Sequence, residues 1–199
     1  MLDTSVRRRI SPALEIAARR VARRGVSAGQ ITAVGLGVGV AACIAAASGR
    51  WGLALVLWLA NRALDGLDGQ VARLRGPTDL GGMLDLVADF VVYGGFVVAV
   101  AIAEPDARLA CSALLAAYLL NNVALLSFAA LVEKRRMSLG DERSLRFTPA
   151  LTEGTETIVV YCLFCLLPGD AELIAWVFTA MVLISVAQRI DVARRTLSP

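Results

Sequence analysis

Four aspartates lie close together in the chain, among apolar segments: Asp65, Asp68, Asp85 and Asp89. Asp65 and Asp68 are three residues apart, so on a helix they share one face. Asp85 and Asp89 are four residues apart, and on a helix they too share a face. A carboxylate at membrane depth costs free energy and usually marks a functional site. Two such faces that oppose each other would form a cage of oxygen ligands.

A cage of carboxylate oxygens predicts a particular chemistry. Mg²⁺ and Mn²⁺ prefer carboxylate and water oxygens, and they are usually shared with the phosphates of a substrate. The pattern therefore favours phosphoryl transfer assisted by divalent cations. The chain contains no histidine, which excludes His-based general base catalysis, Ser-His triads and the commonest zinc sites.

The four cysteines offer a Cys-x-x-Cys pair, but in the wrong surroundings for redox or metal chemistry. Cys162 and Cys165 lie inside an apolar run, and Cys43 and Cys111 are each alone in theirs. We expect all four to be small packing residues.

The composition predicts the elements that position the aspartates. Hydrophobic residues make up 57% of the 199 residues, and the charges are confined to a few clusters. This composition indicates an all-α membrane protein, a bundle of six transmembrane helices. The six expected spans are residues 31–47, 52–65, 80–103, 109–132, 158–168 and 173–188.

The second and fifth of these runs lead directly into charged residues, at 62–68 and 153–156. A helix that continues past its apolar part toward the cytoplasm would explain this, with its polar turns lining an interior cavity.

The distribution of Lys and Arg predicts the orientation. Seven arginines precede the first span, and further basic clusters follow the second, fourth and sixth. With six spans, the positive-inside rule places both termini and both carboxylate pairs at the cytoplasmic face. A five-span alternative, in which residues 52–65 do not cross, would put the basic segment 134–146 outside.

The N-terminal segment does not look like a signal peptide, because residues 1–24 have no continuous apolar core and no small-residue cleavage site. Its apolar positions recur at helical spacing among arginines. This predicts an amphipathic helix on an anionic membrane surface, in preference to a plain solvated arm. We therefore divide the chain into a juxtamembrane helix, residues 1–27, and a six-span domain, residues 28–199.

The aspartates belong to a longer pattern that resembles the CDP-alcohol phosphotransferase family of membrane enzymes. The family shares an Asp-x-x-Asp-Gly-x-x-Ala-Arg block, followed shortly by Gly-x-x-x-Asp-x-x-x-Asp. The positions that carry the resemblance are Asp65, Asp68, Gly69, Ala72, Arg73, Gly81, Asp85 and Asp89.

Two departures from the family pattern stand out. The interval between Arg73 and Gly81 is one residue shorter than in the commonest version, and we expect a loop over residues 74–80 to absorb the difference. Residues 25–32 resemble the family's entry to the first span, but Ala28 and Gly29 stand where the family has Pro-Asn. This weakens any transfer of nucleotide contacts to that segment.

The resemblance implies a role for each motif residue. Asp65, Asp68 and Asp85 would hold two divalent cations, Mg²⁺ or Mn²⁺. Asp89 would complete the second cation site and take the proton of an acceptor hydroxyl.

The remaining motif positions would serve the nucleotide. Gly69 and Ala72 share the face of Asp65, so that a nucleotide could approach the backbone. Arg73 would supply a positive charge for the diphosphate, and Gly81 would leave room on the facing helix.

The implied reaction transfers a phosphatidyl group from a CDP-linked lipid, foremost CDP-diacylglycerol, to an acceptor alcohol with release of CMP. The family also implies a homodimer and a bacterial-type inner membrane location.

The acceptor side is less specific. Glu153 and Glu156 would bind a polyol or attract an amine, whereas Arg143 and Arg146 would suit a phosphorylated acceptor such as glycerol 3-phosphate. A phosphatidylglycerophosphate synthase is the leading specific candidate. These residues could equally pair with one another, and a cytoplasmic loop would carry the arginines by topology alone.

Other classes remain open at this point. A Mg²⁺-dependent membrane prenyltransferase also binds a diphosphate through helix aspartates, but such proteins resemble nine-span bundles. A cation transporter lined by the aspartates should carry polar residues through the whole bilayer depth. The aspartates could also be simple ion-pair partners of Arg62, Arg73 and Arg75.

Overall fold

The computed structural model of the chain describes residues 14–135, 152 and 154–197. Within these residues the regular elements are all helical, which confirms the predicted all-α class. Residues 14–23 form a first helix. The α-helices that follow are α2 (Ala28–Ala47), α3 (Trp51–Arg75), α4 (Asp79–Ala103), α5 (Arg108–Lys134), α6 (Gly154–Leu166) and α7 (Ala171–Leu197).

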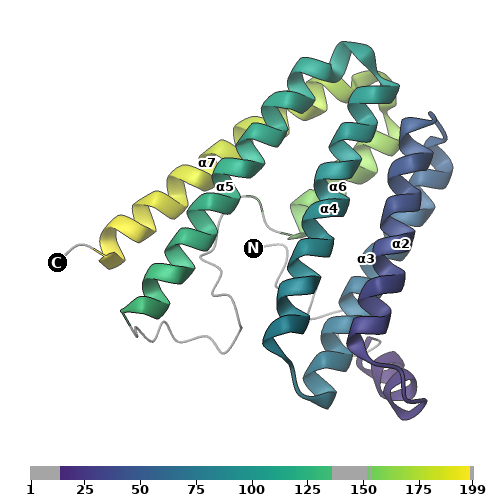
Figure 1. Cartoon of the computed structure of the whole chain (residues 1–199). Coiled ribbons are helices and arrows are strands. Elements are labelled where there is room, and N and C mark those ends of the chain that lie inside the picture. Colours follow the sequence, from purple (N-terminus) through teal and green to yellow (C-terminus); the bar gives the residue numbers. More distant parts are fainter. Residues whose placement is uncertain (1–13, 136–151, 153, 198–199) are drawn as a thin grey trace.

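The helices form two groups (Figure 1). Helix α2 packs along both α3 and α4, and these three make a compact trio. Helices α5 and α7 run side by side as a long pair that diverges from the trio. Helix α6 packs mainly on α3 and connects the pair to the trio.

An aromatic cluster fills the interior between the two groups. Trp58 of α3 stacks on Tyr161 of α6 with ring centroids 4.7 Å apart, and Phe96 of α4 lies 5.1 Å from Tyr161. Trp58, Phe96 and Tyr161 are fully buried. Many large aliphatic side chains are exposed on the outside of the bundle instead, as expected for a surface that faces lipid tails.

Length and hydropathy qualify four helical segments as membrane spans: Ala28–Ala47, Asp79–Ala103, Pro105–Lys134 and Pro168–Leu197. The chain is therefore a multi-pass membrane protein. Helix α3 carries too many charges to qualify, and α6 has only 13 residues. The count of six spans and their orientation stay predictions.

Helix α3 continues well past the predicted span 52–65, without a break, to Arg75. The whole Asp-x-x-Asp-Gly-x-x-Ala-Arg block is thus helical, as the predicted continuation of this span beyond its apolar part requires. The predicted loop over residues 74–80 is too long, because only residues 76–78 separate α3 from α4.

The residues of this connection explain how the chain turns within three residues. Gly76 has a φ of 93°, a conformation that suits glycine. The Thr78 hydroxyl caps α4 by accepting a hydrogen bond from the Gly81 amide at 3.1 Å. The turn fixes the start of α4 directly beside the end of α3.

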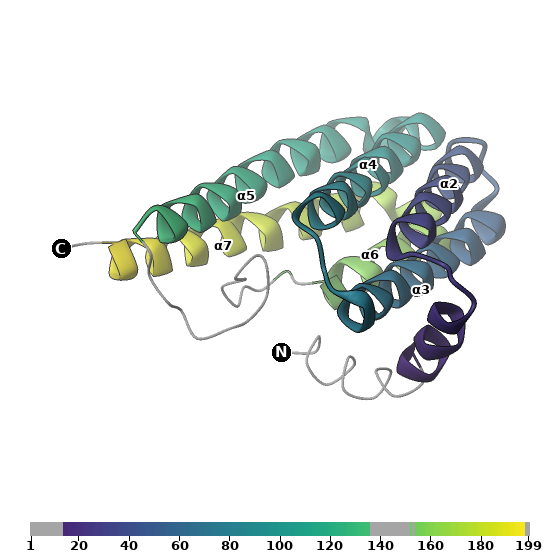
Figure 2. The same ribbon diagram turned by 60° about the horizontal axis from the view of Figure 1, so that its bottom comes forward.

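The first helix is docked on the trio at the end nearest this connection (Figure 2). Its Ala18 is fully buried with Ile31 of α2 and Val71 of α3. Arg75 donates hydrogen bonds to the carbonyl oxygens of Ala22 and Gly25, at 2.5 and 3.2 Å. Residues 1–13 of the predicted amphipathic helix lie outside the described residues, and the division at residue 27 stays a prediction.

Candidate active site

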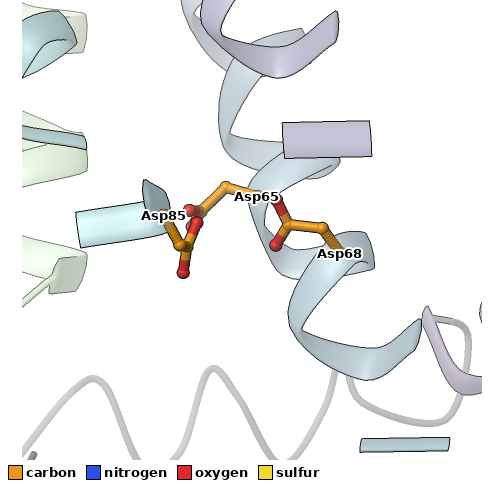
Figure 3. Close-up of side chains that lie close together, drawn as sticks. All are labelled: Asp65, Asp68 and Asp85. Atoms are coloured by element: carbon orange, nitrogen blue, oxygen red, sulfur yellow. The ribbon is translucent and has the colours of Figure 1, made fainter. Parts of the chain in front are cut away.

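Three of the four predicted aspartates form a carboxylate cluster. Asp65 and Asp68 come from successive turns of α3, and Asp85 faces them from α4 (Figure 3). One carboxylate oxygen from each of the three lies within 4.8 Å of the other two. A set of hard oxygen donors this close together fits a divalent cation such as Mg²⁺ or Mn²⁺. We call these three residues the carboxylate cluster.

Asp89 lies one turn beyond Asp85 on α4 and is engaged differently. Its Oδ1 accepts a hydrogen bond from an Nη of Arg62 at 3.0 Å. The same nitrogen lies 3.8 Å from Oδ2 of Asp65. The structure thus joins the fourth aspartate to the cluster through an arginine.

Arg62 is the residue whose role the sequence did not reveal. Its side chain is 7% exposed. It donates to the Tyr93 hydroxyl at 2.7 Å, and its Nε donates to Oδ1 of Asn61 at 2.9 Å. The guanidinium carbon lies 4.8 Å and 4.7 Å from the ring centroids of Trp58 and Tyr93, a cation–π arrangement. In the sequence, Arg62 is an arginine within an apolar helix segment. That pattern predicted only an ion-pair partner for the aspartates.

Asp68 is held from the side of α2. It is buried, and the Thr32 hydroxyl donates a hydrogen bond to its Oδ2 at 2.8 Å. Asn61 provides a second link, because its side-chain amide donates to the Gly35 carbonyl oxygen at 2.8 Å. Thr32 belongs to the segment 25–32, whose resemblance to the family's entry to the first span implied no role for this residue.

An open pocket extends over these residues, with about 10 Å³ of room for the centre of a water-sized sphere. Helices α2, α3 and α4 all contribute to its walls. The lining residues are Thr32, Gly35, Leu36, Asn61, Arg62, Asp65, Asp68, Asp85, Ala88, Asp89 and Val92.

The other motif residues do not line this pocket. Gly69 and Ala72 are half-buried on α3, and Arg73 is exposed. A Cβ added at Gly69 would meet the Arg73 guanidinium at an ordinary 3.7 Å, so no tight internal contact explains this glycine. A Cβ at Gly81 would lie 2.8 Å from the Thr78 hydroxyl. The capping contact at the start of α4 therefore explains a glycine at this position. The predicted nucleotide contacts of these four residues stay predictions.

Of the four predicted acceptor residues, the structure describes one, Glu156. Glu153, Arg143 and Arg146 lie outside the described residues. Glu156 is half-buried in the first turn of α6. Its assignment to an acceptor stays a prediction.

Polar contacts that the sequence did not indicate link α7 to Thr152, just before α6, and to α5. The Thr152 amide donates to the Ser185 hydroxyl of α7 at 2.9 Å. Arg189 of α7 is buried, and its Nε donates to Oδ1 of Asn121 on α5 at 3.1 Å.

Comparison with known proteins decides the family. Residues 26–188 match the profile of the CDP-alcohol phosphatidyltransferases. The chain belongs to this family. The resemblance seen in the aspartate motif is thus confirmed, and the protein is a membrane phosphatidyltransferase of phospholipid synthesis. This membership favours phosphatidyl transfer over prenyl transfer or cation transport.

One curated relative of this phosphatidyltransferase is the inner membrane protein YnjF of Escherichia coli strain K12. The two are 38% identical over 187 residues, which cover 91% of this chain and 89% of YnjF.

Solved structures of Mycobacterium tuberculosis phosphatidylinositol phosphate synthase (PgsA1) share the fold. The structure with CDP-DAG bound has a TM-score of 0.71 and 19% identity, covering 91% of this chain and 93% of that one. The complex with manganese and citrate also has a TM-score of 0.71, with 18% identity over 90% of this chain and 88% of that one.

Proposed function

We propose that the protein transfers the phosphatidyl group of CDP-diacylglycerol to an acceptor alcohol and releases CMP. The observation that carries this proposal is the carboxylate cluster, since its three residues occupy motif positions and meet across α3 and α4. The PgsA1 structure that contains CDP-DAG supports a CDP-lipid as donor.

We propose two divalent cations as cofactors, Mg²⁺ or Mn²⁺. The cluster residues Asp65, Asp68 and Asp85 would hold them, and Asp89 would complete the second site. The manganese in one PgsA1 structure supports this assignment. When bound, the cations would neutralise the diphosphate and the charge that develops on the departing CMP.

The chain's own residues would then orient and activate the reactants. Arg73 would contact the diphosphate, while Gly69 and Ala72 would let the nucleotide approach the surface of α3. Asp89 would accept the proton of the acceptor hydroxyl at a carboxylate oxygen. The alcohol oxygen attacks the lipid-side phosphorus, and the bond from that phosphorus to the CMP oxygen breaks.

For the acceptor we propose glycerol 3-phosphate, with Arg143 and Arg146 as its phosphate ligands. This would make the enzyme a phosphatidylglycerophosphate synthase. Glu153 and Glu156 favour the alternative of a polyol or an amine-bearing alcohol. We further propose a homodimer in a bacterial-type inner membrane, with the site and both termini cytoplasmic.

The deciding experiment measures CMP release from CDP-diacylglycerol by the purified protein in liposomes with Mg²⁺ or Mn²⁺. The acceptors compared are glycerol 3-phosphate, inositol phosphate, inositol, serine, ethanolamine and choline. We expect release with one acceptor, lost in Asp89→Asn and kept in Asp106→Asn, an exposed aspartate beyond the far end of α4. Failure of the protein to bind CDP-diacylglycerol in the presence of either metal would overturn the proposal.

A further inference from the structure

Arg62 brings a fixed positive charge into the acidic site. Its guanidinium lies between Asp89, at 3.0 Å, and Asp65, at 3.8 Å. An arginine stays protonated in proteins, so this charge is present at every working pH.

The position of Arg62 does not depend on the carboxylates alone. Asn61 and the Tyr93 hydroxyl accept its hydrogen bonds, and the rings of Trp58 and Tyr93 lie against its guanidinium. Trp58 itself is fully buried in the aromatic cluster. These contacts would hold the side chain in place even without Asp89.

A second divalent cation bound by Asp65 and Asp89 would lie beside the positive charge of Arg62. In sites with two metal ions, the ions are about 3.5–4 Å apart and share carboxylates between them. Asp65 is the residue that could be shared here, because it belongs to the carboxylate cluster and also lies beside Arg62. The guanidinium therefore takes up the position between Asp65 and Asp89.

We propose that Arg62 is a positioning residue that keeps Asp89 out of the carboxylate cluster, so that the protein without its lipid substrate binds one divalent cation and not two. This inference rests on the proposed function, which assigns cations to the cluster. The diphosphate of the substrate adds the negative charge that a second cation requires, so that cation binds only together with the donor lipid.

The test is a count of Mn²⁺ ions per chain, made by calorimetric titration of detergent-purified protein without CDP-lipid. We expect one ion for the unaltered protein and two for Arg62→Gln, in which Asp89 is released. The double variant Arg62→Gln/Asp89→Asn should return to one ion, because the released ligand is gone. Arg62→Lys, which keeps the positive charge, should also bind one.

The controls separate this inference from the proposed function. Arg108→Gln, at the opposite end of the trio, should leave the count at one. Asp85→Asn should bind no ion. If the unaltered protein binds none either, the cation site itself is wrong. If it binds two and Asp89→Asn binds one, the site stands and the role of Arg62 is overturned.

The folding of Arg62→Gln is checked by size-exclusion chromatography and helical circular dichroism. A folded Arg62→Gln that binds one ion overturns the inference. If this variant does not fold, the unaltered protein and Asp89→Asn decide: one ion in both supports the inference, and a fall from two to one overturns it.

Discussion

The α2–α4 trio and the α5–α7 pair are built from similar apolar helices but are held together differently. In the trio, hydrogen bonds from Thr32 and Asn61 link the helices around a group of carboxylates. In the pair, Arg189 of α7 donates a hydrogen bond to Asn121 of α5, and Tyr118 and Phe178 lie edge to face at 6.1 Å. The carboxylates that could hold a cation are thus gathered in the trio, whereas this polar contact of the pair joins an arginine to an amide.

The largest effect expected from this comparison is the loss of the cluster. Replacing Asp85 by Asn removes the α4 contribution to three converging carboxylates. We expect CMP release to fall below detection and Mn²⁺ to lose its effect on the melting temperature. The melting temperature without metal should change little, because a half-exposed carboxylate among like charges adds little stability. A CMP release rate near that of the unaltered protein would show that the trio does not carry the chemistry.

A smaller effect is expected at Thr32, which touches a predicted ligand without being one. Thr32→Val keeps the shape of the side chain but removes the hydrogen bond to Asp68. Loss of such a supporting contact typically lowers metal affinity about 10–100-fold. The measurement is Mn²⁺ titration. The matched control is Thr179→Val in α7, whose buried hydroxyl bonds only to the local Ala175 carbonyl oxygen among the contacts described; its affinity should not change.

The tight packing of the trio predicts a stability effect without a chemical one. A Cβ at Gly39 would lie 2.4 Å from Cγ2 of Val92, so Gly39→Ala forces α2 and α4 apart. Overpacking of this kind costs about 1–3 kcal/mol. Melting curves in detergent should show the loss for Gly39→Ala but not for Gly37→Ala, where nothing lies within 4 Å. Val92→Ala should restore stability in the Gly39→Ala background; no recovery would contradict the close approach.

The smallest effect concerns the docking of the first helix. Arg75→Met removes two hydrogen bonds to the carbonyl oxygens of Ala22 and Gly25. Each such bond is worth about 1 kcal/mol or less at an exposed position. Amide exchange in residues 14–23 should speed up several-fold, while the cores of α2 and α3 stay protected. An unchanged exchange rate would mean that the buried contact of Ala18 alone holds this helix.

The sequence predicted the spans of α2, α4 and α5 to within a few residues of the helix ends, because apolar runs there stop near glycines or charges. The full length of α3 was harder to predict. The apolar run ends at Arg62, but the helix and its backbone hydrogen bonds continue to Arg75. The loop prediction over residues 74–80 failed for the same reason.

The site was predictable where it depends on local spacing. The i, i+3 spacing predicted that Asp65 and Asp68 share one helix face, and the family motif added Asp85 to the predicted cation ligands. The separate engagement of Asp89 depends on Arg62 of α3 and Tyr93 of α4, which meet only in the folded trio. Thr32 reaches Asp68 across 36 positions in the chain, a contact that no local pattern contains.

The three-residue connection between α3 and α4 has a consequence for biogenesis. Closing so short a loop costs little entropy, and α2, which packs along both α3 and α4, precedes them in the chain. Every residue of the carboxylate cluster belongs to α3 or α4. During synthesis the cluster can therefore assemble as soon as α2, α3 and α4 have entered the membrane, before the ribosome has made α5, α6 and α7.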